Sequence, residues 1–408
     1  MRKYHVIKEA FLASSLIVLI TFLISALPFK NEFLKGIRQD VNGFDVYDLT
    51  FNDESQRNVR DTNIVIVEIG EDRSQIVEQI NLIETYQPAV LAVDAYFEQP
   101  KDSAVDLQLS NLVAKYKNLF FGSRLEEHKI TPKKRFGPDS EFTIVSNFFE
   151  EKNTSQHSGF INFVGDNYSV IRTYPPFVKI NDTAVPAFTS RILMHFSAEK
   201  YKKLQKRGYK ESVINYSGNM PEKYTGITKE QLYEYHQTNQ LSNLLKNKII
   251  LLGYFVKDPP FVLQDLHFSP LNKNIAGKGF PDMYGVVIHA NILSMLIDNK
   301  YTALASKGVS FFFAFLFTFL FLCYVIHLHS LKSHPSHAWI LLLQFLIILL
   351  TIYIFLQVFN FFLWKVPLSS TIISLVLCIE MLGLYKIIAL WLNRKTGFIT
   401  VFNKNHIV

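Results

Sequence analysis

Long apolar runs stand at both ends of the chain. The first covers residues 11–29, and three more follow closely on one another at 308–328, 338–363 and 368–392. An α-helix rises about 1.5 Å per residue, so each run is long enough to cross the roughly 30 Å hydrocarbon core of a bilayer. The pattern predicts one N-terminal and three C-terminal transmembrane helices around a segment of mixed polarity at 30–307.

The basic residues that flank these runs predict an orientation. The first run is long and lacks a small-residue cleavage site, so we expect a retained anchor rather than a signal peptide. An even number of crossings places both termini on one side. The positive-inside rule assigns that side, with residues 1–10 and 393–408, to the cytoplasm. The basic residues that then face the cytoplasm are Arg2, Lys3, Lys8, Lys332, Arg394, Lys395 and Lys404, against Lys365 alone in the outer turn. We therefore expect a multi-pass cell-membrane protein, in a bacterium the inner membrane, whose main domain is extracytoplasmic.

Between the apolar ends, β-branched runs alternate with amphipathic stretches. Residues 63–69, 89–93 and 118–121 have the pattern of buried strands, and the stretches between them repeat apolar residues at helical spacing. Further strands are expected at 159–163, 213–216 and 248–252, and a further helix at 186–196. This order predicts an α/β domain with a mostly parallel sheet and helices on both faces.

Composition and charge refine this picture only slightly. The chain is 49% hydrophobic and carries a net charge of +7, part of which is the juxtamembrane Lys and Arg. The positive charge is therefore evidence for membrane orientation more than for nucleic-acid binding. The sequence contains no nucleic-acid-binding motif. Both cysteines, Cys323 and Cys378, fall inside apolar helices. The large domain must be stabilised by packing rather than by disulfides.

Four polar side chains are candidates for ligand binding, because ligands of open α/β sheets bind beyond the carboxyl ends of the strands. Asp94 follows the second strand, where it either binds a cation or polar ligand or caps a turn or helix, with capping favoured. Asp265 and His267 lie two residues apart in a loop, and a hydrogen-bonded loop is favoured over a metal site. His289 is interpreted as a packed histidine rather than a ligand. We expect no metal site and no cofactor.

An apolar helix is predicted to begin near Gly285 and to end near Ile297, ten residues before the next transmembrane run. This short connection makes the helix the expected mechanical link between the domain and the membrane. Gly285 and Asn291 are therefore candidates for coupling.

Glu380 is a third coupling candidate, because it lies midway along the last apolar run. A charged group there costs about 3 kcal/mol on insertion scales. One interpretation is a protonated clamp between helices, and the other is a polar contact that couples helix movement or docks a partner. Hydrogen-bonding side chains expected at matching depth are Thr318, Thr351 and Tyr353.

Several of these segments together resemble the second class of CHASE domains, the sensory extracellular modules associated with cyclases and histidine kinases. The matching features are the strand 64–69, Asp94 with Phe97, Asp166 before Ile171-Arg172, the strand 248–253, the loop 265–270 and the helix start 285–291. The resemblance covers residues 1 to about 392 and implies an extracellular sensor. Members usually continue into an output domain, so here we expect a form without one. No catalytic residue is carried over.

Three functions remain as hypotheses. The first is a sensor or scaffold subunit that relays an envelope or extracellular stimulus through its helices to a separate membrane or cytoplasmic signalling protein, with a homodimer as one arrangement. The second is a structural or docking subunit of a transport or envelope complex. The third is an extracytoplasmic hydrolase, which needs Asp94, Asp265, His267 or His289 to converge. No Gly-rich phosphate loop, Gly-x-Ser-x-Gly or His-Glu-x-x-His motif supports an enzyme.

Overall fold

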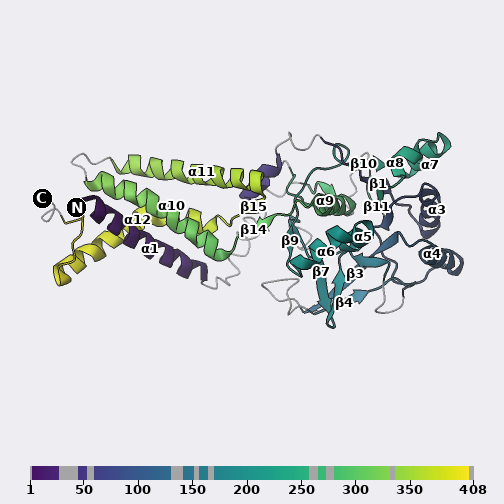
Figure 1. Ribbon diagram of the computed structural model, residues 1–408, viewed down its shortest axis with the longest axis horizontal. Coiled ribbons are helices and arrows are strands. Elements are labelled where there is room, and N and C mark those ends of the chain that lie inside the picture. The colour runs from purple at the N-terminus through teal and green to yellow at the C-terminus, as the bar shows by residue number, and fades with distance from the viewer. Residues whose placement is uncertain are drawn as a thin grey trace. The chain divides into compact units, whose positions relative to one another are not determined.

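The computed structural model describes the chain at residues 2–26, 45–52, 59–129, 141–150, 156–163, 170–256, 265–272, 280–330 and 336–403. It divides into two compact units (Figure 1). One, the sheet unit, covers residues 37–302. The other, the helical unit, combines residues 1–36 with 303–408.

A seven-stranded mixed sheet forms the centre of the sheet unit. The strand order is β10-β1-β11-β2-β3-β4, with β5 pairing beside β3. The strands are β1 (Ile64–Glu68), β2 (Val90–Val93), β3 (Leu119–Lys129), β4 (Glu141–Val145), β5 (Ser158–Phe160), β10 (Thr225–Ile227) and β11 (Ile249–Gly253). Only the β3–β4 pairing is antiparallel; the other pairings in this sheet are parallel. The prediction of an α/β fold with a mostly parallel sheet is confirmed for this unit.

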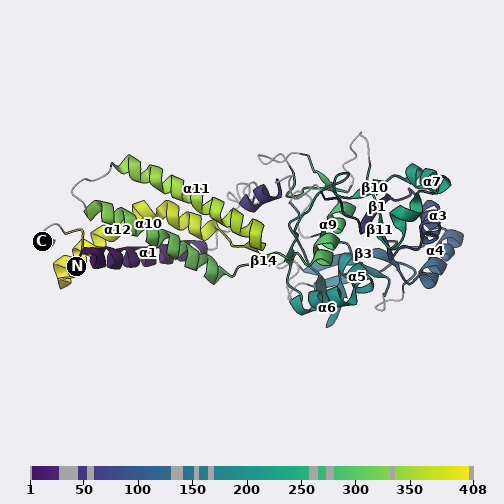
Figure 2. The same ribbon diagram turned by 45° about the horizontal axis from the view of Figure 1, so that its top comes forward.

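Helices cover both faces of this sheet (Figures 1 and 2). One face carries α3 (Arg73–Glu84), α4 (Ser103–Lys115), α7 (Lys229–Gln237) and α8 (Leu241–Leu245), and the other carries α5 (Phe188–Phe196), α6 (Ala198–Arg207) and α9 (Gly285–Asp298). Successive strand residues point to opposite faces, so Ile64 and Ile66 of β1 enter one core while Val65 and Val67 enter the other. This two-sided burial explains why the central strands are continuous apolar runs.

Two of the predicted strands are shorter than expected. The expected strand 213–216 is represented only by β9 (Ser212–Val213), which pairs with β6 (Thr173–Tyr174) outside the main sheet. Of the remaining residues, Asn215 N donates to Met295 Sδ of α9, whereas Tyr216 OH donates to the Ile171 carbonyl. The expected strand 159–163 is represented by β5, which ends at Phe160. Further short antiparallel pairs are β7 (Phe177–Ile180) with β8 (Thr183–Pro186), and β12 (Leu266–His267) with β13 (Met283–Tyr284).

A glycine at the end of β11 allows α9 to lie directly against the sheet. A Cβ built on Gly253 would stand 2.6 Å from Val286 Cγ2 and 3.3 Å from Asp94 Cβ. Since the valine is itself fully buried, it has little room to move.

We expect Gly253→Ala to lower the free energy of unfolding of the sheet unit by about 1–3 kcal/mol, the usual cost of overpacking a core. Native-state hydrogen exchange of the β11 amides in the full chain measures this change. Gly208→Ala is not a suitable control, because Gly208 has a positive φ of 71°. Ser242→Ala on the exposed side of α8 is suitable, and we expect it to change stability by less than about 0.5 kcal/mol.

The helical unit contains four long apolar helices, α1 (Arg2–Ala26), α10 (Lys307–Ser330), α11 (His337–Phe362) and α12 (Ser369–Thr396). Each contains a stretch long and apolar enough to cross a membrane, as expected from the sequence. The first helix begins earlier than the predicted run, and residues 27–29 lie outside the described part. A short parallel pair, β14 (Ala303–Leu304) with β15 (Trp364–Lys365), completes the unit. The early start of α1 places Glu9 inside a helix.

Candidate functional site

Asp94 lies at the carboxyl end of β2 and faces α9. Its Oδ1 is 3.7 Å from His289 Nε2, and both side chains are buried, with exposed fractions of 7% and 5%. None of the described helices is capped by the Asp94 side chain. Asp102 caps α4 by accepting from the backbone N–H groups of the helix's first turn. The capping interpretation of Asp94 was therefore wrong: the strand ends several residues before the helix starts, and the carboxyl group turns inward instead.

His289 sits in the second turn of α9 among aromatic rings. It stacks on Phe163 with ring centroids 4.7 Å apart and meets the edge of Phe188 at 5.3 Å. Its Nδ1 has no hydrogen-bond partner among the described residues. The environment fits the packed-histidine interpretation, with one ring nitrogen beside a carboxyl group and the other unsatisfied.

Asp265 and His267 form the outer part of the same cluster. His267 Nε2 lies 3.3 Å from Asp265 Oδ1, and the two side chains are partly exposed. The Asp265 carbonyl accepts from Gly285 N at 3.1 Å, which ties this loop to the first residue of α9. Among the residues that the structure describes, no group of three or more His, Cys, Asp or Glu side chains is arranged to hold a metal ion. The contact fits a hydrogen-bonded loop.

Burial sets the protonation of the inner pair. It raises the pKa of Asp94 well above its usual value, and the nearby Asp265 carboxylate raises it further. Burial lowers the pKa of His289 from 6.5 to about 3, and His267 adds to this effect. At neutral pH the imidazole of His289 is therefore neutral, and burial favours the protonated form of Asp94.

The two shifts predict opposite pH effects on stability. The stability linked to Asp94 is fully present below its unfolded pKa of 3.8 and is lost as the pH rises through its higher folded pKa. The stability linked to His289 is fully present above 6.5 and is lost as the pH falls toward about 3. We expect Asp94→Asn to become progressively more stable than the wild type as the pH rises above about 4, by up to about 1.4 kcal/mol per pH unit.

Exchange of the β11 amides in the full chain, measured over a pH series, tests this expectation. Glu98→Gln in the same loop is the control, because the Glu98 side chain is 47% exposed. A difference between wild type and Asp94→Asn that does not change with pH would contradict the assignment.

A surface cleft of about 770 Å³ lies beside the carboxyl ends of β1 and β2. Its walls include residues 71–74, which lead into α3, and residues 96–99, which follow Asp94. Arg73 fixes one wall: it donates to Asp106 Oδ1 at 2.5 Å and to the Gln99 carbonyl at 2.6 Å. The loop that begins at the buried Asp94 thus continues as a wall of an open cleft.

Asn291 joins α9 to the segment after β9. Its Oδ1 accepts from Ser217 N at 2.8 Å and from Gly218 N at 3.2 Å, and its Nδ2 donates to the carbonyls of Gly218 and Val287, each at 2.9 Å. The side chain is completely buried. Every polar atom of the amide is used, so this residue fixes the position of the 217–218 backbone against the helix.

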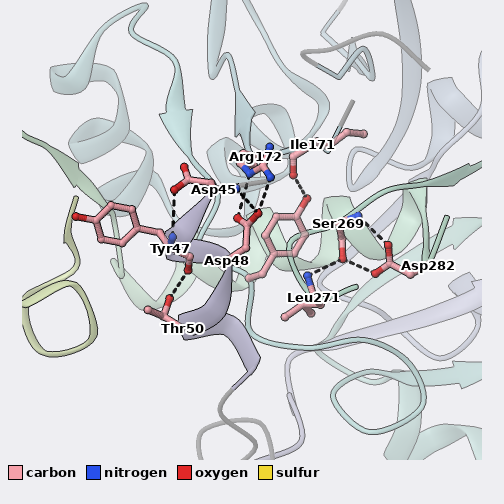
Figure 3. Close-up of polar contacts among 10 residues, drawn as sticks. Asp45, Tyr47, Asp48, Thr50, Ile171, Arg172, Ser269, Leu271 and Asp282 are labelled. Carbon is pink, nitrogen blue, oxygen red and sulfur yellow. Dashed lines mark hydrogen bonds and ion pairs between the residues drawn. The ribbon is translucent and has the colours of Figure 1, made fainter. Parts of the chain in front are cut away.

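A second polar network holds η1 (Val46–Asn52), the 3₁₀ helix that is the first described element after α1 (Figure 3). Arg172 donates through Nε to Asp48 Oδ1 at 3.0 Å and through Nη2 to Oδ2 at 2.5 Å. Tyr216 packs edge-on against Phe51, with centroids 6.2 Å apart, and donates to the Ile171 carbonyl at 2.7 Å. Residues 215–218 therefore contact both η1 and α9. Neither Asp48 nor Tyr216 was among the site residues predicted from the sequence.

Residues 16–326 match the family model of the CHASE2 domain. The chain belongs to the CHASE2 domain family. This confirms the resemblance inferred from the sequence, and CHASE2 is a family of sensory extracellular domains. No curated protein and no solved structure gave a significant match. Of the features that carried the resemblance, Asp166 lies outside the described residues.

In this CHASE2 protein Glu380 does not lie between helices of its own bundle, where the clamp interpretation expected it. Glu380 is exposed on α12, and its side chain has no hydrogen-bond partner among the described residues. Thr318 is buried without a partner, Thr351 donates to the Ile347 carbonyl, and Tyr353 is 60% exposed. An intramolecular clamp from Glu380 was therefore a wrong interpretation, because the side chain points away from its own bundle.

A different acid is buried in the helical unit of the CHASE2 protein. Glu9 of α1 is completely buried, and its Oε2 accepts from Tyr385 OH at 2.5 Å. Glu9 was not among the predicted site residues, because the predicted apolar run starts at Phe11. An acid close to the start of one apolar helix and a tyrosine in the C-terminal half of another are the signals that could have identified it.

Proposed function

We propose that this CHASE2 protein is an extracytoplasmic sensor that binds rather than transforms its ligand and relays the change to a cytoplasmic signalling partner. Its membership in a sensory extracellular family supports the sensing role. The relay, the partner and the position of the sheet unit outside an inner membrane are parts of the proposal. The four apolar helices and the flanking basic residues support that topology.

The observation that carries the proposal is the placement of α9. Near its start it carries His289 against Asp94, and Asp94 opens the loop that lines the cleft. At its end only residues 299–306 separate it in sequence from α10, a candidate membrane span. A ligand held by residues 96–99 can thus act on Asp94, on His289 and then on a helix that is followed in the chain by a candidate membrane span.

The burial of α9 favours movement as one body. All of its residues except the last are buried, from Gly285 to Ile297. A well-packed interior transmits displacement instead of absorbing it locally. A ligand shifts the equilibrium only if it prefers one of two arrangements, so binding must favour one position of this helix over another.

Hydrogen exchange on the full chain in lipid nanodiscs tests the relay. We expect Asp94→Asn and His289→Phe to change the protection of residues 290–306, which cover the rest of α9 and the segment that follows it. Glu78→Gln, an exposed acid on α3 outside the cleft lining, is the matched control. If both cluster variants affect only residues near the cluster, the route through α9 is refuted.

The partner is tested by gentle solubilisation from native membranes and mass spectrometry of what co-purifies in stoichiometric amount. A protein with a cytoplasmic kinase, cyclase or other regulatory domain supports the sensor. Recovery of envelope or transport proteins alone would favour the docking-subunit hypothesis. A topology reporter fused near residue 200 that is active only in the cytoplasm would overturn the extracytoplasmic placement.

A further inference from the structure

Two opposite faces of α12 have different neighbours. The face that packs inside the helical unit consists of Thr371, Ser374, Leu375, Cys378, Leu382, Tyr385 and Ala389. An α-helix turns about 100° per residue, so Glu380, nine positions after Thr371, points about 180° away from that face. The carboxyl group therefore projects outward from the bundle, in agreement with its exposure.

Glu380 belongs to a second, outer seam along the same helix. Its exposed members are Ile373, Val376, Glu380, Leu384, Ile387 and Trp391. They recur at intervals of three and four residues, the spacing of one helix face. Lipid covers the apolar members without penalty, but a charged group in that position costs about 3 kcal/mol on insertion scales. Glu380 is thus the one member of the seam that requires a polar neighbour.

Space for that neighbour exists beside the acid. Gly383 is exposed one turn along the helix, and a Cβ built on it would meet no atom within 4 Å. Small residues on membrane helices allow two backbones to approach closely, which strengthens packing and interhelical hydrogen bonds. The open position beside Glu380 therefore suits a second helix.

We propose that the outer seam is the contact between two copies of this chain, with the two Glu380 carboxyl groups hydrogen-bonded to each other. Copies inserted in the same orientation hold Glu380 at the same depth, so a twofold contact brings the two acids together. A carboxyl group that carries its proton both donates and accepts a hydrogen bond, so two facing carboxyl groups complement each other. A different protein would need its own polar group at that depth. This contact does not depend on the relay through α9.

Self-association of the full chain in lipid bilayers, measured by single-molecule photobleaching over a dilution series, tests the acid. We expect Glu380→Leu to raise the dimer dissociation constant about 3- to 30-fold, the range of one intramembrane hydrogen bond. Glu380→Gln retains a donor and an acceptor and should stay near the wild type. Tyr353→Leu removes another exposed polar group, on α11, and should change little.

Cysteine cross-linking in native membranes tests the geometry. In a Cys323→Ala background, with the buried Cys378 left in place, we expect Ile387→Cys to form disulfide-linked dimers. Phe345→Cys, equally apolar and exposed on α11, should do so at least tenfold less. Because the side chains of Ile387 and Phe345 face outward, neither variant disturbs the fold.

The proposal is overturned by a chain that stays monomeric at all dilutions, by a Glu380→Leu variant that associates like the wild type, or by equal cross-linking at both cysteine positions. Capture of a different membrane protein through Glu380, with this chain itself monomeric, would also overturn it, because the partner of the acid would then not be a second copy. A dimer without a detectable signalling partner would leave this contact intact and count only against the proposed relay.

Discussion

Asn291→Leu is expected to lower the free energy of unfolding of the sheet unit by about 3–5 kcal/mol. The leucine would leave the N–H groups of Ser217 and Gly218 and the Gly218 carbonyl without their present partner in a buried position. Each unsatisfied buried group costs about 1–3 kcal/mol. Native-state hydrogen exchange of the β11 amides in the full chain reports the change.

Asn243→Leu is the matched control, because Asn243 is exposed on α8. It should change stability by less than about 0.5 kcal/mol. If Asn291→Leu were as mild as this control, the amide would not be holding the 217–218 backbone, and residues 215–218 could not connect η1 to α9 in the way described.

Arg172→Met is expected to cost about 3 kcal/mol and to release η1. The substitution keeps most of the apolar stem but leaves the Asp48 carboxylate, whose exposed fraction is 13%, without its ion-pair partner. Hydrogen exchange should show the amides of residues 46–52 losing protection first, and β11 should report the global change.

The exposed pair Lys179–Asp182 supplies the comparison for this ion pair. Its side chains are 51% and 90% exposed, so Lys179→Met should cost less than about 1 kcal/mol. A double-mutant cycle of Asp48→Ala with Arg172→Met isolates the pair itself. A coupling energy near zero would show that η1 is held by the contact of Phe51 with Tyr216 instead.

Local patterns predicted the elements of this fold better than their arrangement. β1, β2 and β11 are short apolar runs, and α9 is an apolar helix, so each was recognisable from its own residues. The insertion of β11 between β1 and β2 was not predictable, because residues far apart in sequence choose that neighbour. The expected strand at 213–216 is cut short for a related reason: Asn215 N donates to Met295 Sδ and Tyr216 OH donates to the Ile171 carbonyl, and both partners are distant in sequence.

The candidate site shows the same division. Asp94, Asp265, His267 and His289 were found by their positions after strands and near a helix start, and the structure brings all of them into one region. Their burial and the direction of Asp94 were not predictable, since both depend on how α9 packs. Glu380 was noticed as a costly residue, but whether it faced inward or outward required the packed face of α12.

The strand order also has a consequence for biosynthesis. β1 pairs with β10 and β11, and β2 pairs with β11 on the side away from β3. The centre of the sheet therefore cannot close until residues 225–253 have been made. Until then β1 and β2 keep unpaired edges, which are prone to aggregation during slow, non-local folding. In a chain that is made from its N-terminus, the last central strand β11, the helix α9 and the candidate membrane span α10 are synthesised in direct succession. The sheet can therefore be completed only shortly before this candidate span is made.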